Sequence, residues 1–325
     1  MTRYIALLQV ISIILVILIG MPVAVGAGQL TGMDVYVVGS HAYVAGGTDG
    51  LYVIDVRRSS HPTQVAALDT RGEAKGVYVL SSHAYVADGS AGLQVVDVRD
   101  PASPGIIGAV ETPGDARHVY VFADYACVAD GPAGLQIINI RDPARPRPVA
   151  SIGMPGEAQR VYVAGDYAYV AAGTGGLQII DIRKPAQPRI VASVSAIRDA
   201  RSLHVLSDYA YVADISYGVH AIDISNPTRP RVAGSTDTPG EASGIYKLYD
   251  LLFVADGSSG LQLIDARDPR ALLIVASHDL PGETRSIYGL ASTVYVAGME
   301  FGFGAFDIIG RSRLQAKGHF LADPD

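Results

Sequence analysis

An acidic residue and a basic residue stand close together at regular intervals along this sequence. The acids are Glu73, Asp115, Glu157, Asp199, Glu241 and Glu283, and bases follow five of them within three residues: Lys75, Arg117, Arg160, Arg201 and Arg285. Paired charges of this kind can hold a polar ligand, supply general acids and bases, or neutralise one another. They act together only if the fold brings them to one place.

Five residues in or next to these positions form the predicted ligand-binding group. They are His118, Arg160, Asp199, Arg201 and His204. His204 interrupts a column that holds Tyr36, Tyr78, Tyr120, Tyr162, Tyr246 and Tyr288 at the same spacing. We expect acid–base or anion-binding roles if the five side chains lie within hydrogen-bond reach, and mutual neutralisation if they do not. No residue is assigned as catalytic.

Motifs with a known mechanism are absent. The sequence has no His-Glu-x-x-His helix, Gly-x-Ser-x-Gly elbow, Gly-Lys-Ser/Thr phosphate loop or EF-hand loop, and its one cysteine is Cys127. Asp88, Asp130, Asp214 and Asp256 occupy equivalent Asp-Gly or Asp-Ile turns, but one carboxylate per turn is too few for calcium. We therefore predict no metal and no cofactor, with these carboxylates accepting backbone N–H bonds.

A 42-residue period positions all of these residues. The four-residue segment Ala42–Ala45, which ends in Val-Ala, recurs in similar form every 42 residues as far as Val294–Ala297. Each repeat reads as four short strands rich in Val, Ile and Tyr, joined by Gly- and Pro-containing turns. Segments such as Leu135–Ile140 are apolar on both faces, which indicates strands that are covered on both sides.

We predict an all-β fold, a seven-bladed β-propeller with four antiparallel strands per 42-residue blade. The propeller spans residues 32–325, and its blades are 32–73, 74–115, 116–157, 158–199, 200–241, 242–283 and 284–325. A seven-turn β-solenoid is the structural alternative. First and last segments are in phase with the repeat, so ring closure should need no exchanged strand. The loops that carry the charged pairs would then meet at one mouth of the central channel.

The repeat also resembles a known family. Gly92-Leu93-Gln94-Val95-Val96-Asp97-Val98-Arg99-Asp100-Pro101-Ala102-Ser103-Pro104, preceded by Ala84–Gly89, is similar to the LVIVD repeat. That resemblance implies an exported or surface-attached prokaryotic propeller. It adds no catalytic residue.

The N-terminal segment predicts export. Arg3 precedes the apolar run Ile5–Ile19, and small residues end at Ala27, which is the pattern of a signal peptide over residues 1–27. Retention as an N-terminal anchor is the alternative. Either outcome places the repeats in the cell envelope or outside the cell.

The net charge and the absence of catalytic motifs limit the classes of function that the sequence allows. The net charge of −7 disfavours a nucleic-acid partner, which would need a basic face. We expect a monomeric, non-enzymatic interaction scaffold that binds an extracellular or envelope protein or a glycan, with the membrane contacted only through an uncleaved N-terminal segment. The alternative is a propeller hydrolase or lyase with a polar site at the channel mouth.

Overall fold

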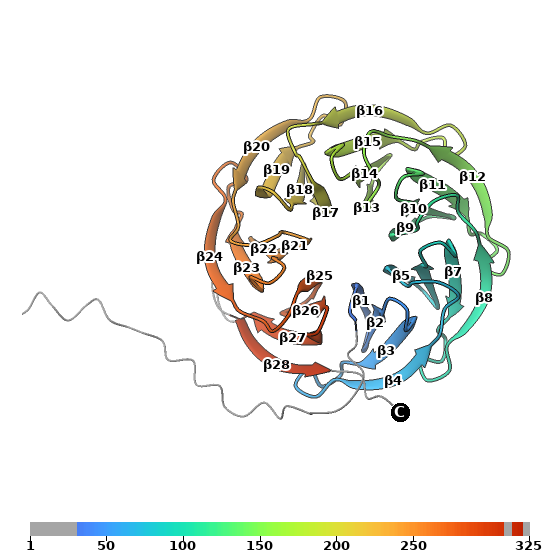
Figure 1. Ribbon diagram of the computed structural model, residues 1–325. Coiled ribbons are helices and arrows are strands. Elements are labelled where there is room, and N and C mark those ends of the chain that lie inside the picture. The colour runs from blue at the N-terminus through green and yellow to red at the C-terminus, as the bar shows by residue number, and fades with distance from the viewer. Residues whose placement is uncertain (1–30, 309–313, 321–325) are drawn as a thin grey trace, which may run out of the picture.

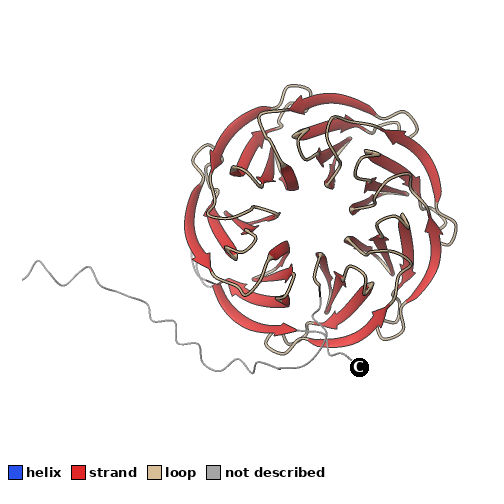
Figure 2. Ribbon diagram, in the orientation of Figure 1, coloured by secondary structure: helices blue, strands red, loops and turns tan. Residues whose placement is uncertain are grey.

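Seven four-stranded antiparallel sheets surround a central channel, as Figure 1 shows. The computed structural model describes residues 31–308 and 314–320, so the predicted signal peptide lies outside the described residues. Every sheet is built from four strands that are consecutive in the chain, and the described part contains strands and turns but no helix (Figure 2). The predicted all-β, seven-bladed propeller is confirmed.

The strands of a blade run outward from the channel in chain order. The first strands, next to the channel, are β1 (Asp34–Val38), β5 (Gly76–Leu80), β9 (His118–Phe122), β13 (Arg160–Ala164), β17 (Ala200–Leu206), β21 (Gly244–Leu248) and β25 (Thr284–Leu290). The second strands are β2 (His41–Ala45), β6 (His83–Ala87), β10 (Tyr125–Ala129), β14 (Tyr167–Ala171), β18 (Tyr209–Asp214), β22 (Leu251–Ala255) and β26 (Thr293–Gly298). The third strands are β3 (Leu51–Asp55), β7 (Leu93–Asp97), β11 (Leu135–Asn139), β15 (Leu177–Asp181), β19 (Gly218–Asp223), β23 (Leu261–Asp265) and β27 (Gly302–Ile308). The outer strands are β4 (Thr63–Leu68), β8 (Gly105–Val110), β12 (Arg147–Ile152), β16 (Arg189–Val194), β20 (Arg231–Thr236), β24 (Leu273–His278) and β28 (Leu314–Phe320).

Side-chain alternation explains how the first strands divide the core from the channel. In β1, Val35 and Val37 are buried, whereas Tyr36 between them is only partly buried. The third strands are buried on both faces, as in β11, where Leu135 and Ile137 on one side and Ile138 on the other have almost no exposure. A sheet that is covered on both faces by neighbouring blades requires this double burial.

The outer strand of each blade is joined to the third strand through a register shift. In blade 3 the shift falls between Ile137 and Ile138, and the other six blades have it at the equivalent place. A bulge of this kind increases local twist and bends the strand. The bend lets the outer strands follow the rim of the propeller.

Seven separate apolar clusters, one between each pair of adjacent blades, make up the core. The cluster that closes the ring packs Val35 and Ile54 of blade 1 against Phe303 and Ala305 of blade 7. Gly32 N–H also donates to Gly298 O at 3.0 Å. Among the residues that the structure describes, blades 1 and 7 share no strand, so closure there rests on face packing, as predicted.

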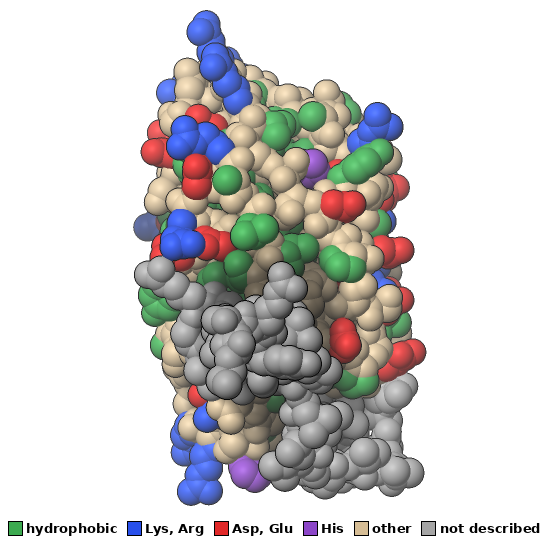
Figure 3. All heavy atoms as spheres, turned by 90° about the vertical axis from the view of Figure 1, so that its left-hand side faces the viewer, with side chains coloured by type: hydrophobic (Ala, Val, Ile, Leu, Met, Phe, Trp, Pro, Cys, Tyr) green, Lys and Arg blue, Asp and Glu red, His purple; other side chains and the backbone are tan. Residues whose placement is uncertain are grey.

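The outer wall is mixed in character. Figure 3 shows positive, negative and apolar side chains intermingled on the side that it presents, with no stripe of one sign. In the part of the chain that the structure describes, no helix has the length and apolar character required to cross a membrane.

Candidate functional site

The loops that lead into the first strands meet at one end of the channel, which we call the mouth. Each of these loops is counted from here on with the blade that it enters, so Glu73 belongs to blade 2, Glu157 to blade 4 and Glu241 to blade 6. Isolated bridges fix these loops, because Ala116 pairs with Gly89 of the preceding blade and Ala158 pairs with Gly131 in the same way. The mouth encloses a pocket of about 670 Å³. This volume lies in the range of ordinary ligand sites, and rigid scaffolds commonly present binding groups on such loops.

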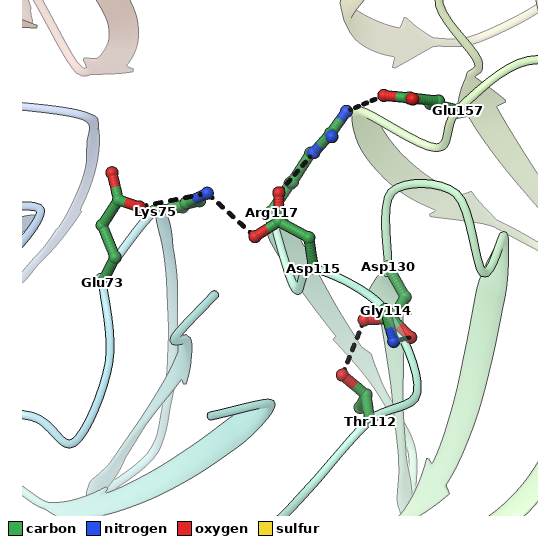
Figure 4. A network of polar contacts seen from close by, with 8 residues as sticks. All are labelled: Glu73, Lys75, Thr112, Gly114, Asp115, Arg117, Asp130 and Glu157. Atoms are coloured by element: carbon green, nitrogen blue, oxygen red, sulfur yellow. Dashed lines mark hydrogen bonds and ion pairs between the residues drawn. The ribbon is translucent and has the colours of Figure 1, made fainter. Parts of the chain in front are cut away.

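A chain of ion pairs runs along one side of the mouth (Figure 4). Lys75 Nζ lies 3.2 Å from Glu73 and 2.8 Å from Asp115, and therefore bridges blades 2 and 3. Arg117 continues the chain, with Nε 2.9 Å from Asp115 and Nη1 2.8 Å from Glu157 of blade 4. The predicted ring of alternating charge exists in this sector, and its members largely neutralise one another.

These pairs shift the protonation equilibria of their members. Burial alone would lower the pKa of Lys75 and raise that of Asp115, but the bonds between them, and those to Glu73 and Arg117, outweigh burial. The pKa of Lys75 is raised and the pKa of Asp115 is lowered. Lys75 and Asp115 are therefore charged at neutral pH.

Beneath the mouth lies a polar layer formed by one first-strand residue from each blade. Its members are Asp34, Gly76, His118, Arg160, Ser202, Gly244 and Ser286. Asp34 is almost fully buried; Val77 N–H donates to its Oδ2 at 3.1 Å and the Ser286 hydroxyl donates to its Oδ1 at 2.5 Å. Arg160 of blade 4 reaches Asp34 Oδ1 of blade 1 at 3.2 Å, so its side chain lies across the channel.

His118 also faces Asp34, and it is neutral. Burial, and then the nearby Arg160 charge, lowers the pKa of His118 well below its usual range. Its Nδ1 accepts from Val161 N–H at 3.5 Å, so the ring proton is on Nε2, which lies 3.9 Å from Asp34 Oδ2. Ser202 completes this side of the layer, and its buried hydroxyl has no hydrogen-bond partner among the described residues.

One layer deeper, seven rings form a closed aromatic collar. Its members are Tyr36, Tyr78, Tyr120, Tyr162, His204, Tyr246 and Tyr288, with neighbouring centroids 4.4–5.2 Å apart around the whole cycle. Burial raises the pKa of Tyr36, Tyr120 and Tyr246, and neighbouring tyrosines add to the effect. Burial, helped by Arg160 and Lys247, lowers the pKa of His204 to about 3. Tyr36, Tyr120, Tyr246 and His204 of the collar are therefore uncharged at neutral pH.

A small cavity of about 110 Å³ lies between the collar and the polar layer. His118 and Arg160 line both this cavity and the mouth pocket, so these two side chains form the partition between them. The cavity has room for a few water molecules and has the polar partners that water requires.

The structure distributes the five predicted site residues over three positions. His118, Arg160 and Arg201 line the mouth pocket, whereas His204 lies deeper, in the collar. Asp199 faces Arg201, with Oδ1 3.1 Å from Nε, although Nε lacks the alignment of a hydrogen bond. His204 Nδ1 accepts from Lys247 N–H at 3.4 Å. Among the described residues, no hydrogen bond joins His118 to His204.

Sequence reasoning missed two parts of the site. The first is Asp34, which holds the polar layer together. It is the one acidic residue among the equivalent positions of the seven repeats, which are 34, 76, 118, 160, 202, 244 and 286, so the sequence contained a signal for it. The tyrosine column was recognised, but its place in the channel was not. Successive side chains of a strand point to opposite faces, so a tyrosine that follows a buried residue such as Val35 is expected to face the channel.

No group of three or more His, Cys, Asp or Glu side chains in the described ranges could hold a metal ion. The turn carboxylates accept backbone N–H bonds, but the donors of Asp88, Asp130 and Asp256 lie in the loop that enters the blade and not in the turn itself. Asp130 Oδ2 accepts from Gly114 N–H at 3.0 Å and Asp130 Oδ1 accepts from the Thr112 hydroxyl at 2.6 Å (Figure 4).

Comparison with known families matches the LVIVD repeat at residues 31–70, 71–112, 113–152, 155–196 and 197–238. These segments cover most of the chain. The chain belongs to the LVIVD repeat family. This LVIVD propeller has two further blades, 6 and 7, which lie outside the matched segments and repeat the same four-stranded sheet.

Solved structures share the fold at low sequence identity. A functionally unknown protein from Desulfotomaculum acetoxidans is 12% identical, with a TM-score of 0.66, over 85% of this chain and 96% of that chain. The WD40 β-propeller domain of Doa1 is 11% identical, with a TM-score of 0.68, over 86% and 93%. BamB from Moraxella catarrhalis is 13% identical, with a TM-score of 0.61, over 88% and 84%. Identities this low establish the propeller fold alone. No curated protein matches the LVIVD propeller in sequence.

Proposed function

We propose that this LVIVD propeller is an exported, non-enzymatic binding protein, and that it holds an envelope protein or glycan at the mouth of its channel. The observation that carries the proposal is the mouth pocket of about 670 Å³ on a rigid ring of loops. The basic side chains Lys75 and Arg117 that line it form ion pairs with neighbouring acids, and the Arg160–Asp34 ion pair forms its floor. Such a surface offers many fixed polar contacts.

One feature of the channel supports binding over catalysis, and one feature of the sequence supports export. The two histidines of the channel are neutral, and each uses Nδ1 to accept a backbone N–H. A general base needs a free acceptor nitrogen within reach of the proton it removes. The signal-peptide pattern of residues 1–27 supports the export part of the proposal.

The experiment is a crosslinking pull-down of the protein from its native envelope, paired with the double variant Arg160→Ala/Arg201→Ala. We expect the double variant to lose partners that the wild type captures, because it removes the pocket floor and one wall. An unchanged set of partners would contradict the mouth as the binding site. Surface protease treatment of intact cells tests export, and a protected, cytoplasmic protein would contradict it.

A further inference from the structure

The mouth pocket is not symmetric about the channel. Blade 6 contributes more of its lining than any other blade, through Pro239–Glu241, Ser243 and the turn Gly257–Ser259. The chain of ion pairs in Figure 4 lies on blades 2 to 4. The largest share of the lining therefore comes from a blade outside this chain of ion pairs.

Blade 6 is also where the alternation of charge fails. Elsewhere each mouth acid has a base from its own blade or from the preceding blade, as Asp115 has Arg117 and Lys75. At blade 6 the position of the base is occupied by Ser243, whose hydroxyl donates to Thr284 O at 2.9 Å. The base of the preceding blade, Arg201, faces Asp199, and that of the following blade, Arg285, faces Glu283 at 2.9 Å.

Glu241 is consequently left without a cation. It is exposed, it lines the pocket, and among the described residues it forms no ion pair or hydrogen bond. The other mouth acids, Glu73, Asp115, Glu157, Asp199 and Glu283, each face a base within 3.2 Å. Ser258 and Ser259 line the same pocket as Glu241, and their hydroxyl oxygens can accept hydrogen bonds.

We propose that the blade 6 sector of the mouth is a subsite for a lysine or arginine side chain of a protein partner. The incoming ammonium or guanidinium group would take the place that Lys75 and Arg117 occupy in blades 2 and 3. Glu241 accepts its charge, and Ser258 and Ser259 accept its remaining N–H bonds. The inference rests on the proposed function and names the partner group that the mouth selects.

The probe is the peptide acetyl-Gly-Gly-Lys-Gly-Gly-amide, compared with the same peptide carrying norleucine, which lacks the ammonium group. Binding is followed by the methyl NMR signal of Ile215, which lines the pocket. We expect the lysine peptide to shift this signal and the norleucine peptide to leave it in place. Glu241→Gln should weaken the lysine peptide about two- to fivefold, as expected for an exposed ion pair.

Matched variants separate this subsite from general electrostatics. Glu73→Gln removes the same charge at blade 2 and should leave affinity unchanged, because it lies across the pocket and is screened. Ser243→Lys supplies the missing base from within the chain and should abolish binding, whereas Gln159→Lys adds the same charge at blade 4 and should not. Ser243→Ala, which removes only the hydroxyl, should bind normally, and thermal unfolding of each variant verifies that it folds.

Equal weakening by Glu241→Gln and Glu73→Gln would overturn the subsite, and so would equal binding of the two peptides. Binding of glucosamine without binding of the lysine peptide would overturn its assignment to a protein side chain. If the peptides fail while Arg160→Ala/Arg201→Ala still changes the captured partners, this inference falls and the proposed function stands.

Discussion

At the residue scale, three of the four buried turn aspartates are accompanied by a threonine whose hydroxyl donates to the carboxylate. The Thr70–Asp88, Thr112–Asp130 and Thr238–Asp256 hydroxyl–carboxylate bonds all measure 2.6 Å. Blade 4 lacks both members, with Met154 and Ala172 in their places. In blade 5 Ala196 stands in the threonine position, and the buried Asp214 accepts from the backbone N–H groups of Arg198 and Ser216, each at 2.8 Å, instead. A buried carboxylate therefore keeps its donors, from a threonine or from the backbone.

We predict that Thr112→Val lowers the free energy of unfolding by about 1.5–3 kcal/mol at neutral pH, because it removes a hydrogen bond to a charged group. The double variant Thr112→Met/Asp130→Ala copies blade 4 and should cost less than the sum of its single changes. Urea unfolding measures all three variants. Strict additivity would show that the pair is not coupled.

The same carboxylate predicts a pH dependence. Burial, opposed by the bonds from Thr112 and Gly114, raises the pKa of Asp130 above its ordinary 3.8. The folded chain therefore holds this proton more tightly than the unfolded chain. Its stabilising contribution is complete below 3.8 and is lost as the pH rises through the raised pKa of the folded state.

Asp130→Asn cannot ionise and lacks this dependence. The stability of the wild type relative to Asp130→Asn should therefore decline as the pH rises from the ordinary 3.8 through the raised pKa of the folded state. Urea unfolding at a series of pH values gives the difference, and a constant difference would contradict the raised pKa.

At the scale of the element, the turn between the second and third strands is the most constrained part of a blade. Gly134 has φ of 77°, and a Cβ on it would lie 2.3 Å from Ile152 O of the outer strand. Equivalent glycines with positive φ, such as Gly92 and Gly260, approach the outer strands of their own blades equally closely. This turn therefore holds the outer strand in place.

Replacing that glycine tests the constraint. Gly134→Ala should lower the free energy of unfolding by more than about 2 kcal/mol, since it combines backbone strain with a clash. Gly105→Ala is the control, because its Cβ would meet no atom within 4 Å and its change should stay within about 0.5 kcal/mol. Chemical denaturation of both variants decides the matter, and equal effects would contradict the argument.

Elements were easier to predict from the sequence than the site. The 42-residue period alone gave the number of blades, the strands per blade and the closure, because equal repeats fold as equal units. The period also predicted that the loops carrying the six acids from Glu73 to Glu283 meet at one mouth of the channel. It could not show which base would face which acid, since Arg201 turns to its own Asp199 while Arg117 reaches the next blade. That choice depends on side-chain geometry and not on spacing.

At the scale of the whole molecule, Asp34 joins blades that are far apart in the chain. It sits in blade 1 and accepts hydrogen bonds from Val77 of blade 2, Arg160 of blade 4 and Ser286 of blade 7. The face packing that closes the ring is therefore supplemented by one buried carboxylate at its centre.

Asp34→Ala should lower the free energy of unfolding by about 3–5 kcal/mol, because it leaves Arg160 and Ser286 without their buried partner. Asp268→Ala breaks an exposed pair with Arg270 and should cost less than about 1 kcal/mol. Thermal unfolding compares the two, and hydrogen exchange should show β1 and β25 losing protection together. A loss confined to β1 would contradict a role in closure.

The aromatic collar makes the protein its own optical probe. The chain has 18 tyrosines and no tryptophan, so its ultraviolet emission is tyrosine emission alone. Six of those tyrosines stand in one cycle with ring centroids 4.7–5.2 Å apart where they adjoin, and at such separations excitation energy passes from ring to ring. Light absorbed anywhere on the collar therefore reports on the channel centre, directly beneath Arg160. Occupancy of the mouth can be followed through the depolarisation and intensity of intrinsic fluorescence, without any label.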